Sequence, residues 1–78
     1  MSNVVLPELG EGITKATLSY WFIQEGEKVR EKDDLVEFTT DKSTFNLPSP
    51  CSGTLIQIIH REGDSVNVGE VVGVIQED

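Results

Sequence analysis

Short runs of strand-forming residues, separated by turn-forming residues, recur along the whole chain. Segments such as "VVLPEL" and "LVEFTT" are rich in β-branched residues, which favours β-strands. The best candidate for a helix, "EGEKVREKDDL", is charged on all sides and has few apolar residues to bury. The pattern therefore predicts an all-β fold. We expect strands at residues 3–7, 16–24, 28–30, 35–40, 43–48, 53–61, 65–67 and 71–76.

The second half of the chain repeats the pattern of the first half at a separation of 37 residues. Residues 16–41 align with residues 53–78, and six of these 26 positions are identical. The identical pairs are Thr17/Thr54, Leu18/Leu55, Glu25/Glu62, Gly26/Gly63, Val29/Val66 and Asp41/Asp78. A short proline-containing strand, "VVLPEL" or "FNLPSP", precedes each copy. The repeat predicts two half-domains, related by a quasi-twofold axis, that form two small sheets facing each other.

The apolar positions of these strands predict the core. The core candidates are Leu18, Trp21, Ile23, Val29, Val36, Phe38, Phe45, Leu47, Leu55, Ile58, Val66, Val74 and Ile75. Between the first strand and its repeat, the first half carries about four extra residues around "GEGI". This loop, Gly10–Thr14, has no counterpart in the second half. It is therefore a candidate for a specific role.

The segment "FTTDKSTF" places one lysine at the tip of a predicted hairpin, because the flanking strands leave almost nothing between them. Asp41 and Lys42 are then the two central residues of the loop. Asp is a favoured turn residue because its side chain bonds nearby backbone N–H groups, whereas Lys has no such preference. Lys42 can be an ordinary solvated lysine. Its position at the join between the halves, with no other Lys or Arg from residue 33 to 60, favours a special role.

The charge of the chain limits the partners that it can bind. The 78 residues form one small domain with a formal net charge of -8. Such a surface repels phosphate backbones and anionic lipids, so we expect no nucleic-acid or membrane partner. The charge suits docking against basic patches of other proteins, and it equally well serves solubility alone.

The reactive side chains give little support to an enzyme. Cys51 and His60 are the only residues of their kinds, so no second Cys or His exists to build a nucleophile–base pair or a disulfide. A single cysteine is typical of a reducing compartment. The N-terminus lacks the basic and apolar regions of a signal peptide, and no apolar run reaches the length of a membrane span.

Taken together, three segments carry a resemblance to a known family. "LPELGEGI", then the long segment from "ATLSYWF" to "CSGTL", then "EGDSVNVGEVVGVI" resemble the lipoyl domain of the acyltransferase (E2) subunit of 2-oxo acid dehydrogenase complexes. The resemblance covers essentially the whole chain, and "LPELGEGI" is most similar to pyruvate and branched-chain members. It implies a flattened barrel, or sandwich, of two four-stranded antiparallel sheets. It also implies that residues 1–78 are one domain of a longer E2 chain.

The resemblance further implies a carrier function rather than catalysis. Lys42 would hold lipoic acid through an amide. The thiamine diphosphate-dependent E1 would reductively acylate the arm, the E2 catalytic core would pass the acyl group to coenzyme A, and E3, the dihydrolipoamide dehydrogenase, would reoxidise the arm. A lipoate–protein ligase or a lipoyl/octanoyl transferase would attach the lipoate. The compartment would be the bacterial cytoplasm or the mitochondrial matrix.

Recognition residues follow from the same resemblance. The modifying enzyme would read Asp41, Ser43, Thr39 and Thr40, with Asp41 also helping to fix the turn. Ser43 stands where many members have Ala, and Thr39 stands where many have an acidic residue. The loop that E1 would recognise, and that should lie close to Lys42, consists of Glu8, Leu9, Gly10, Glu11, Gly12, Ile13 and Thr14. The run of carboxylates from Glu25 to Asp34 lacks the spacing and glycine of a calcium loop, so we expect no metal site.

Two alternatives to a lipoyl carrier remain open from the sequence. A biotinyl carrier domain has the same fold, but biotin acceptors place Met on both sides of the lysine, where this chain has Asp41 and Ser43. An unmodified β-sandwich adaptor would use the acidic surface and leave Lys42 ordinary. The substitution Lys42→Arg distinguishes the adaptor from a carrier, because an adaptor would keep its function and a carrier would lose it.

Overall fold

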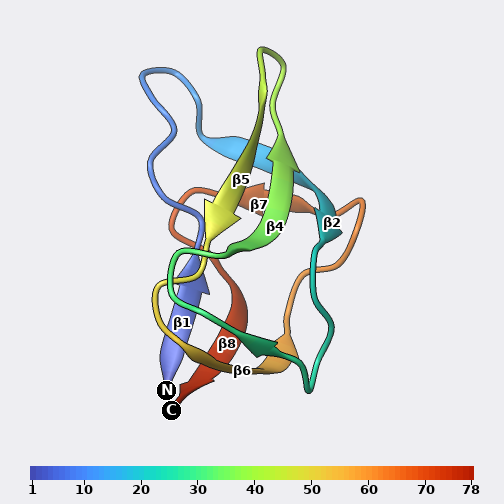
Figure 1. The fold of residues 1–78 in the computed structure, drawn as a ribbon. Coiled ribbons are helices and arrows are strands. Elements are labelled where there is room, and N and C mark those ends of the chain that lie inside the picture. Colours follow the sequence, from blue (N-terminus) through green and yellow to red (C-terminus); the bar gives the residue numbers. More distant parts are fainter.

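In the computed structural model, which describes residues 1–78, eight strands form two four-stranded antiparallel sheets (Figure 1). One sheet has the order β1-β8-β6-β3 and the other has the order β5-β4-β2-β7. The strands are β1 (Ser2–Val5), β2 (Lys15–Trp21), β3 (Lys28–Val29), β4 (Asp34–Thr39), β5 (Thr44–Pro48), β6 (Gly53–Ile58), β7 (Ser65–Asn67) and β8 (Val71–Glu77). All eight predicted strands are confirmed.

The two halves interlock through equivalent hydrogen bonds, as the 37-residue repeat predicts. Leu18 of β2 donates its N–H to the carbonyl of Asp64 at 2.8 Å and accepts from Gly63 at 2.8 Å. The second half repeats both bonds, with Leu55 of β6 donating to Glu27 at 3.0 Å and accepting from Gly26 at 2.7 Å. Each long strand therefore binds the turn of the opposite half. The sheet orders also exchange when the halves are exchanged.

Two predicted strands are too long at their C-terminal ends. The segments 16–24 and 53–61 stop pairing at Trp21 and Ile58, because a tight turn follows each of them. The Glu27 carboxylate accepts the backbone N–H of Gln24 at 2.7 Å, and the Asp64 carboxylate accepts that of Arg61 at 2.9 Å. These bonds satisfy turn backbone that would otherwise continue the ladder.

The core differs in part from the predicted core. The buried apolar residues are Val4, Leu6, Ala16, Leu18, Val29, Leu35, Val36, Phe38, Leu47, Leu55, Val66, Val72 and Ile75. Five predicted members are only partly buried. Trp21, Ile23, Phe45 and Ile58 pack against the edge of this cluster, and Val74 is half-buried.

Leu35 and Val72 join the core because the strand register shifts beside each of them. The β4–β5 pairing steps from Asp34 to Val36, and the β1–β8 pairing steps from Val71 to Gly73. One residue is skipped each time, so neighbours along the chain can both point inward.

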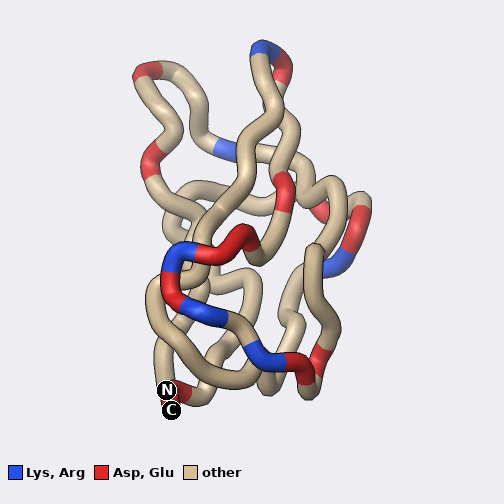
Figure 2. The backbone as a smooth tube through the Cα atoms, in the orientation of Figure 1, with Lys and Arg blue, Asp and Glu red and all other residues tan.

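The molecule is elongated, with extents of 36 × 20 × 17 Å. The β4–β5 hairpin forms one end, and the N- and C-termini lie beside each other at the opposite end (Figure 1). Lys and Arg are scattered among more numerous carboxylates, and one of these cations occupies the hairpin tip (Figure 2). No helix long and apolar enough to cross a membrane is present.

Candidate functional site

The β4–β5 hairpin carries Lys42 at its tip. Thr39 pairs with Thr44 in the last rung of the ladder, and the Thr40 N–H donates to the Ser43 carbonyl at 2.8 Å. Asp41 and Lys42 are therefore the two central residues of the turn, as predicted. Neither has a positive φ, so the turn does not use the left-handed backbone of the hairpin turns rich in Gly and Asn.

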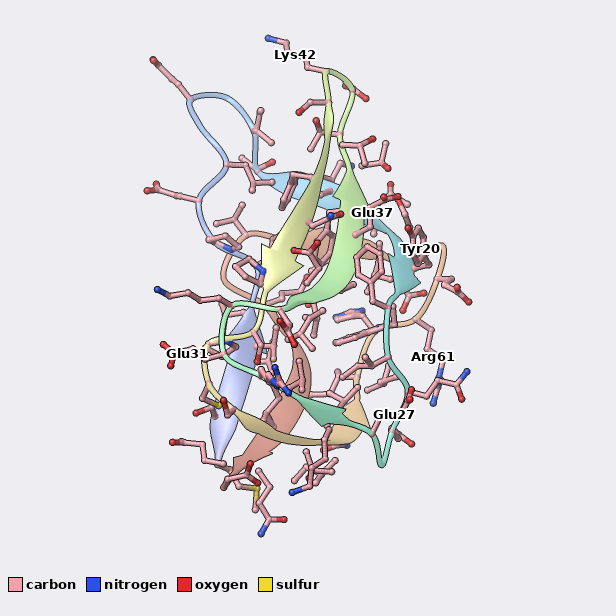
Figure 3. The ribbon with its side chains drawn as sticks, viewed as in Figure 1. Tyr20, Glu27, Glu31, Glu37, Lys42 and Arg61 are labelled. Carbon is pink, nitrogen blue, oxygen red and sulfur yellow. The ribbon has the colours of Figure 1, made fainter.

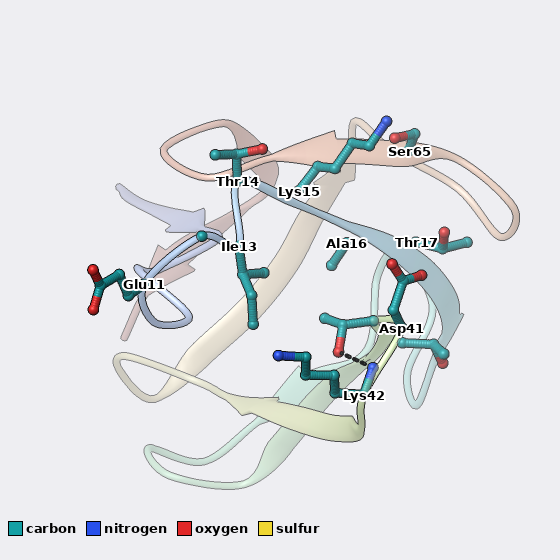
Figure 4. Close-up of a pocket in the computed structure, with 12 residues that line it drawn as sticks. Glu11, Ile13, Thr14, Lys15, Ala16, Thr17, Asp41, Lys42 and Ser65 are labelled. Atoms are coloured by element: carbon teal, nitrogen blue, oxygen red, sulfur yellow. Dashed lines mark hydrogen bonds between the residues drawn. The ribbon is translucent and has the colours of Figure 1, made fainter.

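Thr40, rather than Asp41, fixes this turn. The Thr40 Oγ1 lies 3.3 Å from the backbone N of Lys42 and 3.1 Å from that of Ser43, and it accepts from both; the bond to Lys42 is the dashed line in Figure 4. It also lies 3.1 Å from the Ser43 carbonyl, to which its hydroxyl donates. The Asp41 carboxylate makes no hydrogen bond, so the predicted role of Asp41 in the turn is wrong. The Thr40 hydroxyl, one residue earlier, binds the backbone N–H groups of the turn instead.

The Lys42 side chain extends from the tip into solvent (Figure 3). Its Nζ makes no hydrogen bond and no salt bridge, whereas the turn backbone that bears it is held by Thr40. A primary amine in this state reacts as a nucleophile through its deprotonated fraction, and nothing in the chain obstructs an approaching carboxyl donor. The residues present therefore fit a group attached through an amide at Nζ.

A groove of about 510 Å³ separates the hairpin tip from the β1–β2 loop (Figure 4). Glu11, Gly12, Ile13 and Thr14 line it from the loop, and residues 39–42 line it from the hairpin. Four of the seven residues of the predicted recognition loop thus lie beside Lys42. The remaining lining residues are Lys15, Ala16, Thr17 and Ser65.

Glu8, Leu9 and Gly10 do not line the groove. Leu9 packs against the core, and the Gly10 carbonyl accepts the N–H of Ile13 at 3.2 Å. Leu9 therefore anchors the loop, and Gly10 turns it. Only its second half, Glu11–Thr14, faces the lysine.

A row of hydroxyl groups crosses the sheet below the tip, and sequence reasoning found only one of its members. The Thr39 Oγ1 lies 2.6 Å from the Ser19 Oγ and 3.5 Å from the Thr44 Oγ1. A two-residue turn at Asp41 and Lys42 places Thr44 opposite Thr39, but only Thr39 was predicted to belong to the site. Ser19 was not predictable, because the β2–β4 register shifts between Leu18 and Tyr20.

His60 and Cys51 lie outside this site. The His60 ring lies between two carboxylates, with Nδ1 3.3 Å from Asp64 and Nε2 3.4 Å from Glu70. The backbone N–H of Arg61 and then the His60 ring lower the pKa of Asp64, because both stabilise its carboxylate. Cys51 is a free, half-buried thiol that packs against the core. Neither residue lines the groove.

Comparison with known proteins gives one family match and many relatives. The family model described as "Biotin-requiring enzyme" (Biotin_lipoyl) matches residues 2–75. The succinyltransferase component of the 2-oxoglutarate dehydrogenase complex of Rickettsia bellii is 42% identical over 96% of this chain, which spans 19% of that protein. The acetyltransferase component of the pyruvate dehydrogenase complex of Corynebacterium glutamicum is 39% identical over 95% of the chain and 11% of that protein.

A third relative comes from another complex. The lipoamide acyltransferase component of the branched-chain alpha-keto acid dehydrogenase complex of Bacillus subtilis is 34% identical over 97% of this chain and 18% of its own length. The chain thus spans less than a fifth of these three relatives.

Solved structures agree with the fold. The lipoyl domain of the 2-oxoglutarate dehydrogenase complex of Azotobacter vinelandii superposes with a TM-score of 0.80 at 28% identity. That match covers 99% of this chain and 98% of the other. The urea carboxylase of Kluyveromyces lactis gives a TM-score of 0.81 at 20% identity, over 96% of this chain and 6% of that one. The carboxylase likeness concerns the fold alone.

Proposed function

This chain belongs to the Biotin_lipoyl family, as a lipoyl domain of the kind found in E2 acyltransferase components, and from that premise we propose that Lys42 carries lipoic acid. The observation that carries the proposal is the state of Lys42. Its amine is exposed and unpaired, while Thr40 holds the turn beneath it. The domain presents the lysine and contributes no catalytic group.

The attachment step needs only an accessible amine from this chain. The deprotonated Lys42 Nζ attacks the carbonyl carbon of lipoyl adenylate, the new amide bond forms as AMP leaves, and the amine proton passes to solvent. When bound, lipoate supplies a ring disulfide that takes up an acyl group together with electrons. The amide removes the positive charge of Lys42. The Thr40 hydroxyl keeps the turn that bears the arm in one conformation.

Lipoate fits this site better than biotin. The residues that flank Lys42 are Asp41 and Ser43, not the methionines that flank a biotinyl lysine. The Azotobacter lipoyl domain also matches at nearly full length in both directions, whereas the biotin-dependent alternative has support from fold and family model alone.

The partners follow from the assemblies in which the relatives act. We infer that the arm of this domain serves an E1 decarboxylase, an E2 catalytic core and an E3 dehydrogenase, and that residues 1–78 work within a longer E2 chain. Tethering keeps the carried group at a high effective concentration near each active site. The segment Glu11–Thr14 flanks Lys42 across the groove, which supports a contact with E1 at this end of the molecule.

Enzymatic lipoylation followed by intact-mass analysis tests the proposal. Incubation with lipoate, ATP and lipoate–protein ligase should add one lipoyl group, and peptide mapping should place it on Lys42. The variant Lys42→Arg should gain nothing, whereas Lys32→Arg, which alters another exposed lysine, should be modified like the native chain. A folded native domain that gains no group, or gains it at another lysine, would contradict the proposal.

A further inference from the structure

The quasi-twofold repeat allows the surface of the sheet that bears Lys42 to be compared with the equivalent surface of the other sheet. Positions 37 residues apart occupy equivalent places in the two sheets. Phe22 donates its N–H to Leu35 at 2.8 Å, and its counterpart Ile59 donates to Val72 at 2.9 Å. Where an exposed side chain differs at such equivalent positions, the same backbone arrangement forms with either residue.

Tyr20 and Phe22 are one such difference. Their rings meet edge to face with centroids 4.8 Å apart, and each residue is nearly two-fifths exposed, at 38% and 39%. The Tyr20 hydroxyl has no hydrogen-bond partner within the chain. The equivalent positions on the other sheet hold Gln57 and Ile59. Exposed aromatic side chains are typical of protein–protein contact surfaces.

The strands beside this aromatic pair carry carboxylates and no cation. Glu37 lies directly across from Tyr20 in the β2–β4 register, and Figure 3 shows the two on the same side of the molecule. Asp34 begins the same strand, where Asn46 donates to it at 3.1 Å. No Lys or Arg occurs in β4 or β5, or in β2 after Lys15. The face thus combines aromatic rings with carboxylates. An arginine beside apolar side chains complements both, because it stacks on a ring while it pairs with a carboxylate.

One partner can cover this face and Lys42 together. Glu37 is five residues before Lys42 along a hairpin strand, which at about 3.3 Å per residue places it roughly 17 Å from the tip. A standard interface buries about 800 Å² per partner, which corresponds to a patch roughly 30 Å across. A partner surface of this size that extends from Lys42 along the hairpin is therefore long enough to reach Glu37 and Tyr20, which faces Glu37 in the β2–β4 register.

We propose that Tyr20, Phe22 and Glu37 form the docking surface for the lipoate–protein ligase that attaches lipoate to Lys42. This enzyme presents an arginine among apolar side chains to them. The inference rests on the proposed function. Among the enzymes that act at Lys42, the ligase binds the domain before the lipoyl arm is attached. It cannot gain affinity from burying the arm's hydrocarbon, so its binding must come from the protein surface.

Steady-state kinetics of lipoylation test the surface. With the unmodified domain, lipoate–protein ligase, lipoate and ATP, the double variant Tyr20→Ser/Phe22→Ser should lower kcat/KM about 10-fold or more, mainly by raising KM for the domain. The matched control Ile59→Ser removes an equally placed side chain that is 46% exposed, and it should change kcat/KM less than about 2-fold. Thermal unfolding of each variant shows that it is folded at the assay temperature.

The charged part of the surface has its own signature. Glu37→Gln should lower kcat/KM about 3-fold at low ionic strength, and the difference should vanish at high salt because the steering charge is screened. Tyr20→Ser alone, which leaves Phe22 in place, should reproduce part of the effect of the double variant.

The outcomes separate this inference from the proposed function. If the native domain is not lipoylated, the proposed function fails. If the native domain is lipoylated and the double variant reacts as fast, only the docking surface fails. Equal losses in Ile59→Ser and the double variant would also overturn it. A double variant that is lipoylated at the native rate but then reacts slowly with E1 would overturn it too. The surface would in that case serve E1 and not the ligase.

Discussion

Lys32 has a left-handed backbone conformation, and the equivalent position in the second half of the repeat is a glycine. Its φ is 75°, and it is the one non-glycine residue with a positive φ. The equivalent residue of the second half, Gly69, has a φ of 92°. Both turns make the same bond, from Lys32 to the Ser49 carbonyl at 2.9 Å and from Gly69 to the Leu6 carbonyl at 2.8 Å. The first half therefore holds a left-handed residue with a Cβ, which costs about 1–2 kcal/mol.

Lys32→Gly should relieve this strain. We expect the free energy of unfolding to rise by about 0.5–1 kcal/mol, because the greater freedom of glycine in the unfolded chain offsets part of the gain. Urea denaturation measures it. The matched control Lys32→Ala removes the same charge and keeps the Cβ, so it should not stabilise the domain. A glycine variant no more stable than the alanine variant would refute the assignment of strain.

Single residues were the least predictable part of the site. The position of Lys42 followed from the sequence, because the turn lies between two strands whose pattern is clear. The role of Thr40 did not follow, since its hydroxyl rotates to whichever backbone groups the finished turn presents. Asp41 was assigned to the turn from residue preference. In the structure, its carboxylate is left free for a partner.

At the scale of strands, the sequence predicted where the strands lie and that β4 pairs with β5, but not the order of the strands within each sheet. Turn residues and β-branched runs located all eight strands, although two of them end three residues earlier than predicted, and the repeat predicted two sheets. Simple alternation then missed Leu35 and Val72, which are the equivalent residues of the two halves. A register shift adjoins each of them, and a shift is not visible in the polarity of the residues.

One packing contact between the two sheets has side chains of different sizes in the two halves of the repeat. The Trp21 ring reaches from β2 to Gly73 of β8, where an added Cβ would lie 2.8 Å from Cη2 of Trp21 and 3.0 Å from the Gln57 carbonyl oxygen. The equivalents of Trp21 and Gly73 in the other half are Ile58 and Val36. A large and a small side chain in one place thus correspond to two medium ones in the other.

Gly73→Ala should therefore be costly because of Trp21. We expect it to lower the free energy of unfolding by about 2 kcal/mol in the native chain, through crowding of the indole. In the background Trp21→Phe, which lacks the crowding atoms, the same change should cost at least about 0.5 kcal/mol less. Chemical denaturation of the four proteins gives this double-mutant cycle. Additive effects would show that the indole does not set the requirement for glycine.

At the scale of the whole molecule, the site and the chain ends lie at opposite poles (Figure 1). The long dimension is 36 Å, and the core and both sheets lie between the termini and the tip of the hairpin. A domain arranged in this way can be joined to other domains at either end while its lysine stays accessible. The β1–β2 loop is different, because it rises beside the hairpin and shares a groove with Lys42.

Attachment of a bulky folded protein at either terminus should thus leave lipoylation nearly unaffected. We expect kcat/KM with lipoate–protein ligase to change less than about 2-fold, because a fused protein at the far pole lies outside an interface of standard size. The same protein inserted between Gly10 and Glu11, at a loop that faces the lysine, should lower kcat/KM at least about 10-fold by blocking the approach. Thermal unfolding identifies any insertion that disrupts the fold. Equal rates for the terminal and loop fusions would mean that the ligase approaches Lys42 without covering the groove.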